Sequence, residues 1–402
     1  MARADVSLPD GMTANSRSCG QSNHLVRTAA GVFYMFYISG SDADFYYLKS
    51  TNYGLTWGTP QLVKGSITGI GLAVWFDKWT PADTGTVIHL VYMESTGSDV
   101  FYRSLDTASD TLGTEQTVFA GASFTAGANT CLSVTKSEAG AILVAFDGDG
   151  GTETGFYKSN EYPVSTGFTA KTDLNEAAST DYYQLFPGND ADTADIYALF
   201  WDRSAGELTL KTYDDSGNSW SESAAIATGL TSIASTTVAP QFSGAVRNSD
   251  GHLCAVWWTN SDNVNADLMF VDITSSASIG TPVKIFDSTD DQGSCALTVD
   301  STDDKLYVFY LGKTDGTETA YTAVNVYYRT STDDGATWGA ETLLTSVARA
   351  LTYVTAPLET DSADFTALFY GVTATAQGFW HTSAFYAAVS KANYPSGLSA
   401  MG

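Results

Sequence analysis

The run Val32-Phe33-Tyr34-Met35-Phe36-Tyr37 decides the fold, because six further short apolar runs along the chain end on an aromatic residue in the same way. The final aromatic residues lie at positions 37, 92, 146, 201, 258, 310 and 370, so successive runs are 52 to 60 residues apart. Each run is continuous rather than alternating, rich in β-forming residues and too short for a helix, which is typical of a strand buried on both faces. The chain therefore contains seven repeats.

Further strand-like segments flank most of the runs. Cys131–Thr135 precedes the third run, Phe45–Lys49 follows the first, and a weaker segment, Pro60–Val63, ends the first unit. Four antiparallel strands in a unit of this length are typical of a β-propeller blade. The sequence therefore predicts an all-β fold in which residues 1–402 form one seven-bladed propeller of four-stranded antiparallel blades.

The seventh unit contains three evident strands and lacks a convincing fourth. We expect residues 1–19, through Asp5-Val6-Ser7-Leu8 or its neighbours, to supply this outer strand and close the ring, since closure removes exposed strand edges. The expected blades cover about residues 20–66, 67–121, 122–178, 179–229, 230–289, 290–348 and 349–402.

The composition limits the classes of partner. Nineteen Lys and Arg residues against 45 Asp and Glu residues give a net charge of -26, which repels nucleic acid and anionic lipid. No apolar run is long enough to span a membrane, so we expect no membrane insertion. The first residues do not resemble a secretory signal, so we expect either a removed signal or release by another route, such as with a virus particle. The four cysteines, Cys19, Cys131, Cys254 and Cys295, have no metal-like spacing and are expected to be free buried thiols.

Three turns between expected third and fourth strands share a pattern. Ser331–Trp338 reads S-x-D-x-G-x-T-W, Ser50–Trp57 has Asn52 in place of the aspartate, and Thr212–Trp220 carries one inserted residue. The pattern resembles the Asp-box, or BNR repeat, of sialidase-like β-propellers. In such a turn the Asp or Asn side chain caps backbone N–H groups, the glycine takes a positive φ and the tryptophan anchors the hairpin. This structural role is expected for Ser50, Asn52, Gly54, Trp57, Asp214, Gly217, Trp220, Ser331, Asp333, Gly335 and Trp338.

The resemblance also implies an alternative fold and a possible activity. Propellers of this superfamily more often have six blades, so a six-bladed sialidase-type ring is the alternative. Their enzymes bind a sugar carboxylate with three arginines and use a Tyr–Glu nucleophile pair and an Asp acid/base. Gln21 stands where the first of these arginines is expected, and a neutral amide does not make the same bidentate charged contact. If the chain is an enzyme, the nearest matches are Asp44 as acid/base, Tyr353 as nucleophile with Glu94 or Glu176 beside it, and Arg349.

Two segments are candidates for ligand binding. Alternation places Trp75, Asp77 and Trp79 on one side of a strand, where an aromatic pair flanking a carboxylate suits a sugar; burial of both tryptophans between blades is the alternative. Asp202 and Arg203 lie in a polar loop that follows the fourth run, on the rim opposite the Asp-box turns.

Asp147 and Asp149 form a weak calcium candidate, because Ca²⁺ prefers clustered carboxylate oxygens; a solvated turn is the alternative. No cofactor motif is present, and no other metal site is expected. The sequence favours a non-catalytic recognition or structural propeller, located outside a cell or on a virion surface, that binds glycan and has a virion or other protein as a further partner. An exo-sialidase-type glycoside hydrolase is the second hypothesis, and a protein–protein interaction scaffold is the third.

Overall fold

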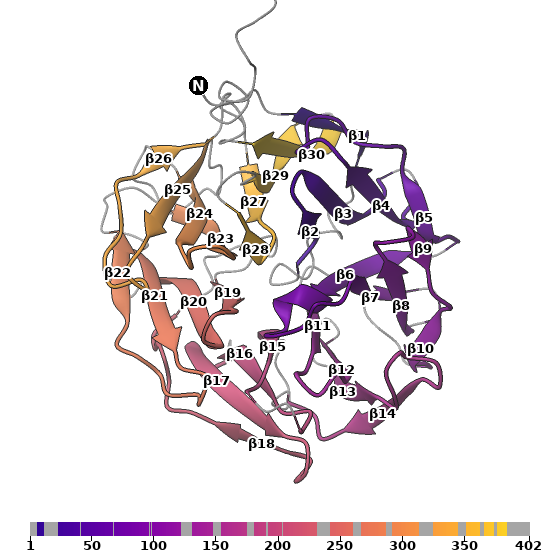
Figure 1. Ribbon diagram of the computed structural model, residues 1–402, viewed down its shortest axis with the longest axis horizontal. Helices are drawn as coiled ribbons and strands as arrows, with labels where there is room; N and C mark the ends of the chain where they lie inside the picture. The colour runs from indigo at the N-terminus through magenta and orange to yellow at the C-terminus, as the bar shows by residue number, and fades with distance from the viewer. Residues whose placement is uncertain are drawn as a thin grey trace, which may run out of the picture.

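The computed structural model is a ring of β-sheets (Figure 1). It describes residues 6–11, 23–40, 42–66, 68–95, 97, 99–121, 131–147, 154–174, 181–189, 192–202, 204–230, 242–259, 267–286, 292–312, 325–344, 351–361, 366–373 and 376–383. The described strands form seven sheets, five of them four-stranded and two five-stranded, so the number of sheets equals the number of apolar runs in the sequence. The expectation of an all-β propeller is confirmed.

Each of the first four sheets is built from consecutive strands. The first contains β2 (Leu25–Ala29), β3 (Val32–Ile38), β4 (Phe45–Ser50) and β5 (Gln61–Lys64). The second contains β6 (Gly69–Phe76), β7 (Val87–Glu94), β8 (Val100–Asp106), β9 (Thr111–Leu112) and β10 (Gln116–Phe119), with the 3-10 helix η2 (Asp77–Trp79) after β6. The third contains β11 (Cys131–Lys136), β12 (Ile142–Asp147), β13 (Thr154–Ser159) and β14 (Phe168–Lys171). The fourth contains β15 (Tyr182–Pro187), β16 (Ile196–Asp202), β17 (Glu207–Asp214) and β18 (Ser219–Glu222).

The last three sheets complete the ring. The fifth contains β19 (Phe242–Arg247), β20 (His252–Thr259), β21 (Asp267–Ile273) and β22 (Val283–Phe286). The sixth contains β23 (Gln292–Asp300), β24 (Leu306–Gly312), β25 (Asn325–Ser331), β26 (Thr342–Leu343) and β28 (Glu359–Thr360), the last pairing with β23 in parallel. The seventh contains β27 (Leu351–Thr355), β29 (Thr366–Thr373), β30 (Ala376–Ser383) and β1 (Val6–Gly11).

The N-terminal strand joins the two ends of the chain. β1 pairs antiparallel with β30, with Val6 opposite His381 and Ser7 opposite Trp380, and so becomes the outer strand of the seventh sheet. We expected this outer strand from residues 1–19, in the neighbourhood of Val6. The pairing fastens the beginning of the chain to its last sheet and closes the ring.

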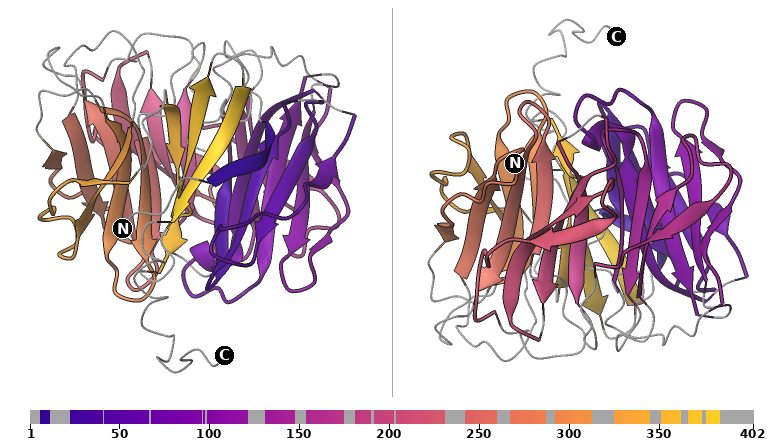
Figure 2. Two further views of the ribbon diagram at one scale, coloured as in Figure 1. Left: turned by 90° about the horizontal axis from the view of Figure 1, so that it is seen from above. Right: turned by 90° about the horizontal axis from the view of Figure 1, so that it is seen from below.

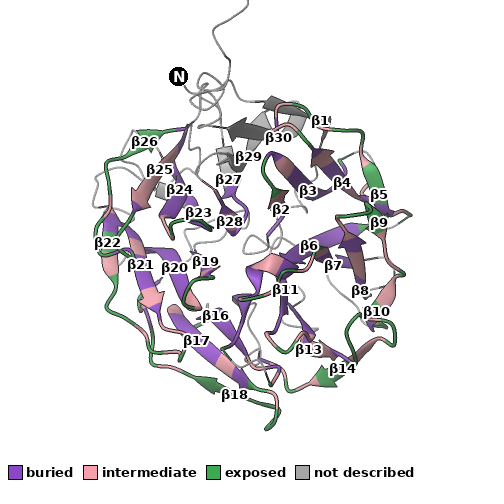
Figure 3. Cartoon of the chain, in the orientation of Figure 1, coloured by how far each residue is buried: buried purple, intermediate pink, exposed green. Residues whose placement is uncertain are grey.

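Burial follows the repeat. The second strand of each of the first six sheets is buried except at its ends, as expected for the continuous apolar runs. Figure 3 shows that exposed residues gather on outer strands such as β5, β14 and β18 and on the turns. Figure 2 shows the strands running between the two faces of the ring. We call the face that carries the first-to-second and third-to-fourth turns of each sheet, such as residues 137–141 and 160–167 of the third sheet, the turn face.

Side chains of the inner strands tie neighbouring sheets together. The hydroxyl of Ser133 accepts the N–H of Leu185 at 3.0 Å, and that of Ser243 accepts the N–H of Leu297 at 3.1 Å. The amide oxygen of Gln184 accepts the N–H of Gly244 at 2.9 Å. Each bond satisfies a backbone donor that the sheet itself leaves unpaired. Polar residues on buried strands therefore join the third sheet to the fourth, the fourth to the fifth and the fifth to the sixth.

Two of the expected turns have the same pattern of internal hydrogen bonds. In Ser331–Trp338, the Ser331 hydroxyl accepts the N–H of Gly335 at 2.9 Å and Asp333 Oδ1 accepts the N–H of Thr337 at 2.9 Å. In Ser50–Trp57 the matching bonds, from Gly54 to Ser50 and from Thr56 to Asn52, are 2.9 and 3.0 Å long. The third turn differs, because Asp214 accepts from the N–H of Gly217 and from the Ser216 hydroxyl instead. Trp57, Trp220 and Trp338 are half-buried rather than enclosed in the core.

The remaining expectations concern single residue types. The described cysteines, Cys131, Cys254 and Cys295, are buried and form no disulfide with one another, as predicted; Cys19 lies outside the described residues. Within the described part of the chain, no helix has the length and apolar character that crossing a membrane requires.

Two buried histidines make the fold sensitive to acid. Burial lowers the pKa of His24 from 6.5 to about 4, against a backbone hydrogen bond with Leu72 that raises it. Burial also lowers the pKa of His89. The unfolded chain takes up these protons before the folded chain does, so the stability present above pH 6.5 falls as the pH decreases towards 4.

Between pH 6.5 and pH 4, we expect the protonation of His24 alone to lower the free energy of unfolding by about 3 kcal/mol. The comparison is between the melting temperatures of the wild type and His24→Gln at pH 7.5 and at pH 4.5. The wild type should lose more on acidification than the variant, because carboxylate titration is common to both. Equal losses would show that His24 is not held neutral by the fold.

Candidate functional site

The expected sugar platform at Trp75, Asp77 and Trp79 is wrong, because all three side chains are buried, at 0, 1 and 2% exposure. β6 ends at Phe76 and the chain turns into η2, so strand alternation does not extend to Trp79. Trp79 instead packs edge-on against Trp75, with ring centroids 5.6 Å apart. The Trp75 indole N–H donates to Thr80. The alternative, burial of both tryptophans, is the correct one.

Asp77 is the centre of a buried charged network between the second and third sheets. Its Oδ1 lies 2.6 Å from Lys136 Nζ and 3.0 Å from His89 Nε2, and its Oδ2 accepts the N–H of Val87 at 2.9 Å. Lys136 also contacts Asp83 Oδ2 at 2.7 Å. The two ions and the imidazole therefore have partners, as buried polar groups need.

The network controls the charge of its members. Burial alone raises the pKa of Asp77, but hydrogen bonds from His89 and Lys136 outweigh it and hold that pKa well below its ordinary value. For Lys136, burial lowers the pKa, and the hydrogen bonds to Asp77 and Asp83 raise it above its ordinary value. The pair is ionised and sealed from water, so it fastens the β6–β7 connection to the third sheet and is closed to a substrate.

Tyr162 carries this network to the surface. Its hydroxyl donates to Asp77 Oδ1 at 3.3 Å, Lys136 Nζ lies 4.0 Å from its ring centroid, and His89 packs edge-on against the ring. The residue is nevertheless 40% exposed. Its ring is therefore held in place from below while part of it faces solvent.

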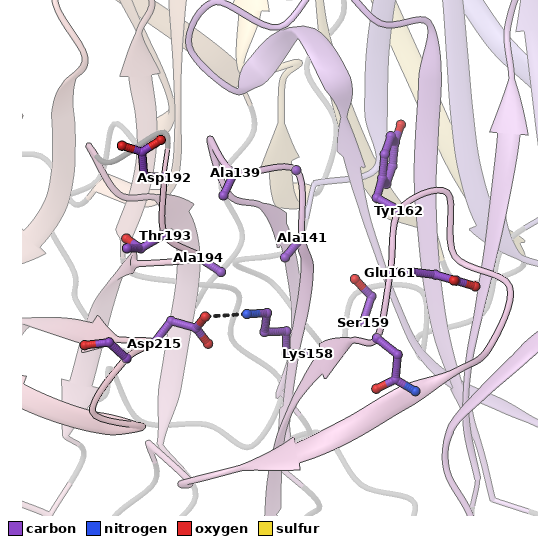
Figure 4. Close-up of a pocket in the computed structure, with 13 residues that line it drawn as sticks. Ala139, Ala141, Lys158, Ser159, Glu161, Tyr162, Asp192, Thr193, Ala194 and Asp215 are labelled. Carbon is purple, nitrogen blue, oxygen red and sulfur yellow. Dashed lines mark hydrogen bonds and ion pairs between the residues drawn. The ribbon is translucent and has the colours of Figure 1, made fainter.

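Tyr162 lines a pocket on the turn face between the third and fourth sheets (Figure 4). The pocket has a volume of about 290 Å³. Four turns and the end of β13 form its lining, which consists of Ala139, Gly140, Ala141, Lys158, Ser159, Asn160, Glu161, Tyr162, Asp192, Thr193, Ala194, Asp215 and Ser216.

An ion pair closes one side of this pocket. Lys158, on β13, pairs with Asp215, in the turn after β17, and Lys171 Nζ lies 3.6 Å from the same carboxylate. In Figure 4, Tyr162 and Asp192 lie on opposite sides of the turn that holds Ala139 and Ala141. The Lys158–Asp215 pair lies below this turn in the view. The pocket thus has carboxylates and hydroxyls around a small hollow, with the Tyr162 ring at its edge and the hydroxyl of that ring directed to Asp77.

The residues suggested for a sialidase-type site come together only in part. Asp44 precedes β4 and Glu94 ends β7. Gly69 lies next to both segments. Its N–H donates to the carbonyl of Ala43, the neighbour of Asp44 in the chain, and it pairs with Glu94 across the second sheet. Burial raises the pKa of Glu94, and the nearby charge of Asp99 raises it further.

Several other suggested residues fall outside the description. Gln21, Glu176 and Arg349 lie outside the described residues, and Tyr353 is described only as part of the backbone of β27. The described residues therefore assemble Asp44 and Glu94 on one rim and no more of that site.

The two remaining candidate sites are partly described. Asp202 ends β16, and its Oδ1 accepts the N–H groups of Ser204 and Ala205 at 2.7 and 2.9 Å. Burial opposes these bonds, but they hold the pKa of Asp202 below its ordinary value, as in a self-capped turn. Arg203 lies outside the described residues.

Asp147 is fully buried, and its Oδ2 accepts the N–H of Asp181 at 3.3 Å. Its expected calcium partner, Asp149, lies outside the described residues. Among the described residues, no group of three or more His, Cys, Asp or Glu side chains is arranged to hold a metal ion.

The pocket at Tyr162 was not foreseen from the sequence. Its lining comes from several segments of two sheets, and the only motif among them, the Asp-box-like turn Thr212–Trp220 that supplies Asp215 and Ser216, predicted a structural role. One signal was present: Lys158 occupies the same third-strand position as Lys49 of the first sheet, and Lys49 likewise pairs with an aspartate, Asp110, of the following sheet at 2.6 Å. A repeated lysine at this position indicates a repeated ion pair between sheets.

Comparisons with known proteins show the fold alone. No protein-family model matches the chain, and no curated protein matches it. AofleA from Arthrobotrys oligospora aligns with a TM-score of 0.50 and 11% identity, over 83% of this chain and 89% of that chain. The SapL1 lectin, solved in complex with alpha methyl fucoside, aligns with a TM-score of 0.45 and 12% identity, over 83% and 98% of the two chains. The Hadza microbial sialidase Hz136 aligns with a TM-score of 0.45 and 13% identity, over 90% of this chain and 65% of that one.

Proposed function

We propose that this protein is a non-catalytic recognition propeller that binds a glycan in the pocket between its third and fourth sheets. The observation that carries the proposal is the exposed, fixed ring of Tyr162 beside polar groups in a hollow of about 290 Å³. Sugars present C–H faces that pack on aromatic rings and hydroxyls that bond to carboxylates and hydroxyls, which is the mixture found in this lining.

The exposure of Tyr162 is selective. Among the described residues, only Leu62, Tyr162 and Leu343 are large apolar side chains that are exposed. Leu62 and Leu343 lie on the outer strands β5 and β26, and neither lines the pocket. An isolated exposed apolar residue needs no explanation, but one that is oriented by a buried network and lines a pocket supports a binding role.

Two finer points belong to the proposal. We take the seven sheets as the seven blades of one propeller, and the turns Ser50–Trp57 and Ser331–Trp338 as copies of the Asp-box, which their matching hydrogen bonds support. We also place the protein outside a cell or on a virion surface, where a partner glycan is accessible; the net charge of -26 supports a dispersed, soluble surface.

A glycan array tests the proposal. We expect the wild type to bind a restricted set of glycans and Tyr162→Ala to lose roughly tenfold in affinity, since an aromatic contact contributes about 1 kcal/mol or more. Tyr162→Phe keeps the ring and should retain most of the binding. Leu343→Ala removes an exposed apolar side chain elsewhere and is the matched control.

Three outcomes would contradict the proposal. Absence of binding by the wild type would favour a protein–protein scaffold, and full binding by Tyr162→Ala would place the site elsewhere. Turnover of a fluorogenic sialoside that is lost in Asp44→Ala would favour the hydrolase.

A further inference from the structure

The charges around the pocket are unbalanced. The lining contains one lysine, Lys158, and three carboxylates, those of Glu161, Asp192 and Asp215. Lys158 is already paired with Asp215, and its side chain is only 23% exposed. With one lysine against three carboxylates the lining carries a net negative charge, and Asp192 and Glu161 are both exposed.

The other cations nearby are also engaged. Lys171 lies 3.6 Å from Asp215, and Lys136 lies within 2.7 Å of both Asp77 and Asp83. A ligand carboxylate or sulfate would have to break one of these pairs to gain a cationic partner, and would meet Asp192 with the same charge. The net charge of -26 on the whole chain adds to this repulsion.

We propose that the pocket selects a glycan that carries free amino groups and is cationic at the working pH. This inference rests on the proposed glycan-binding function. The ammonium group of the sugar binds at the Asp192 side of the pocket, where a carboxylate is exposed. A C–H face of the same or the next sugar ring packs on Tyr162. The Tyr162 ring already has a cation beside it, because Lys136 Nζ lies 4.0 Å from the ring centroid.

The geometry in Figure 4 supports this division of the pocket. Asp192 and Tyr162 lie on opposite sides of the Ala139–Ala141 turn, so a ligand that contacts both the anionic side and the aromatic side must cross this turn. Glu161 extends away from the Lys158–Asp215 pair and contributes charge at the edge of the pocket. The turn between them presents only small residues to the pocket, Ala139, Gly140 and Ala141.

The test uses three oligosaccharides of matched length at pH 6: a glucosamine oligomer, which is cationic, an N-acetylglucosamine oligomer, which is neutral, and a sialylated oligosaccharide, which is anionic. We expect the full-length protein to bind the glucosamine oligomer about tenfold more tightly than the neutral one at low salt. This advantage should shrink as salt is added, because the charges are exposed. The sialylated oligosaccharide should bind weakest.

Variants identify the source of the preference. Asp192→Asn should reduce the advantage of the glucosamine oligomer several-fold and leave binding of the neutral oligomer unchanged. Asp303→Asn removes one exposed carboxylate in the sixth sheet, and should change neither. Tyr162→Ala should weaken both oligomers alike, which separates binding in the pocket from attraction to an acidic surface.

Equal binding of the cationic and neutral oligomers would overturn the inference and leave the proposed function intact. So would tighter binding of the sialylated oligosaccharide, or an unchanged preference in Asp192→Asn. Failure of all three oligosaccharides and of the wider array to bind would overturn the proposed function, and this inference with it.

Discussion

Replacing Lys136 with methionine is expected to lower the free energy of unfolding by about 3–5 kcal/mol, because it leaves the buried carboxylate of Asp77 without its closest cation. Methionine retains the length and apolar stem of the lysine, so the loss reflects charge rather than packing. The substitution also removes the ion pair of Lys136 with Asp83 and its cation–π contact with the Tyr162 ring. The third sheet then loses this ionic attachment to the second and keeps the hydrogen bond from the Thr80 hydroxyl to the backbone carbonyl of Lys136.

Urea unfolding of the single and double variants measures this effect. Asp77→Asn combined with Lys136→Met should be less destabilised than the sum of the two single changes, since each single change strands the other ion. Lys49→Met is the control, because Lys49 makes an ion pair of the same 2.6 Å length with Asp110 at the surface. That change should cost under about 1 kcal/mol. Equal losses in Lys136→Met and Lys49→Met would show that burial adds nothing to the Asp77 pair.

Gly335→Ala is expected to have the second large effect. Gly335 has a φ of +83°, and a Cβ placed on it would lie 1.9 Å from a ring carbon of Phe270 in the neighbouring sheet. The turn must shift or the phenylalanine must move, which breaks the contact between Phe270 and Trp338, whose ring centroids are 5.4 Å apart. We expect a loss of about 3–5 kcal/mol from the backbone conformation and the overlap together.

Gly229→Ala separates the two causes of this loss. Gly229 also has a positive φ, of +70°, but a Cβ there would meet no atom within 4 Å. Gly229→Ala should therefore lower the free energy of unfolding only through the unfavourable backbone conformation, by about 1–2 kcal/mol. Calorimetric melting of both variants checks the difference. If Gly335→Ala melted no lower than Gly229→Ala, the turn would not be packed against Phe270 as described.

The repeat in the sequence was sufficient to predict the ring. Continuous apolar runs such as Val32–Tyr37 became the buried second strands, because a strand covered on both faces leaves no position for polar residues. The outer strand from the neighbourhood of Val6 was also predictable, since the seventh unit lacked one and an unpaired edge is unfavourable. These inferences concern burial and pairing, which local patterns report.

The candidate site depended on information that local patterns do not contain. Asp77 looked like an exposed carboxylate between two tryptophans, but its partner Lys136 lies 59 residues away and turns the segment into a buried attachment. The alternation rule failed because η2 replaces the end of the strand. Tyr162 had no distinguishing neighbour in the sequence, and its exposure becomes meaningful only when four turns of two sheets meet around it.

A crystal structure of the protein soaked with the tightest-binding glycan from the array tests the central claim most directly. We predict that the sugar lies between the third and fourth sheets, with one ring packed on Tyr162 and a polar group at Asp192. A sugar bound at the rim of Asp44 and Glu94, or between any other pair of sheets, would contradict the account.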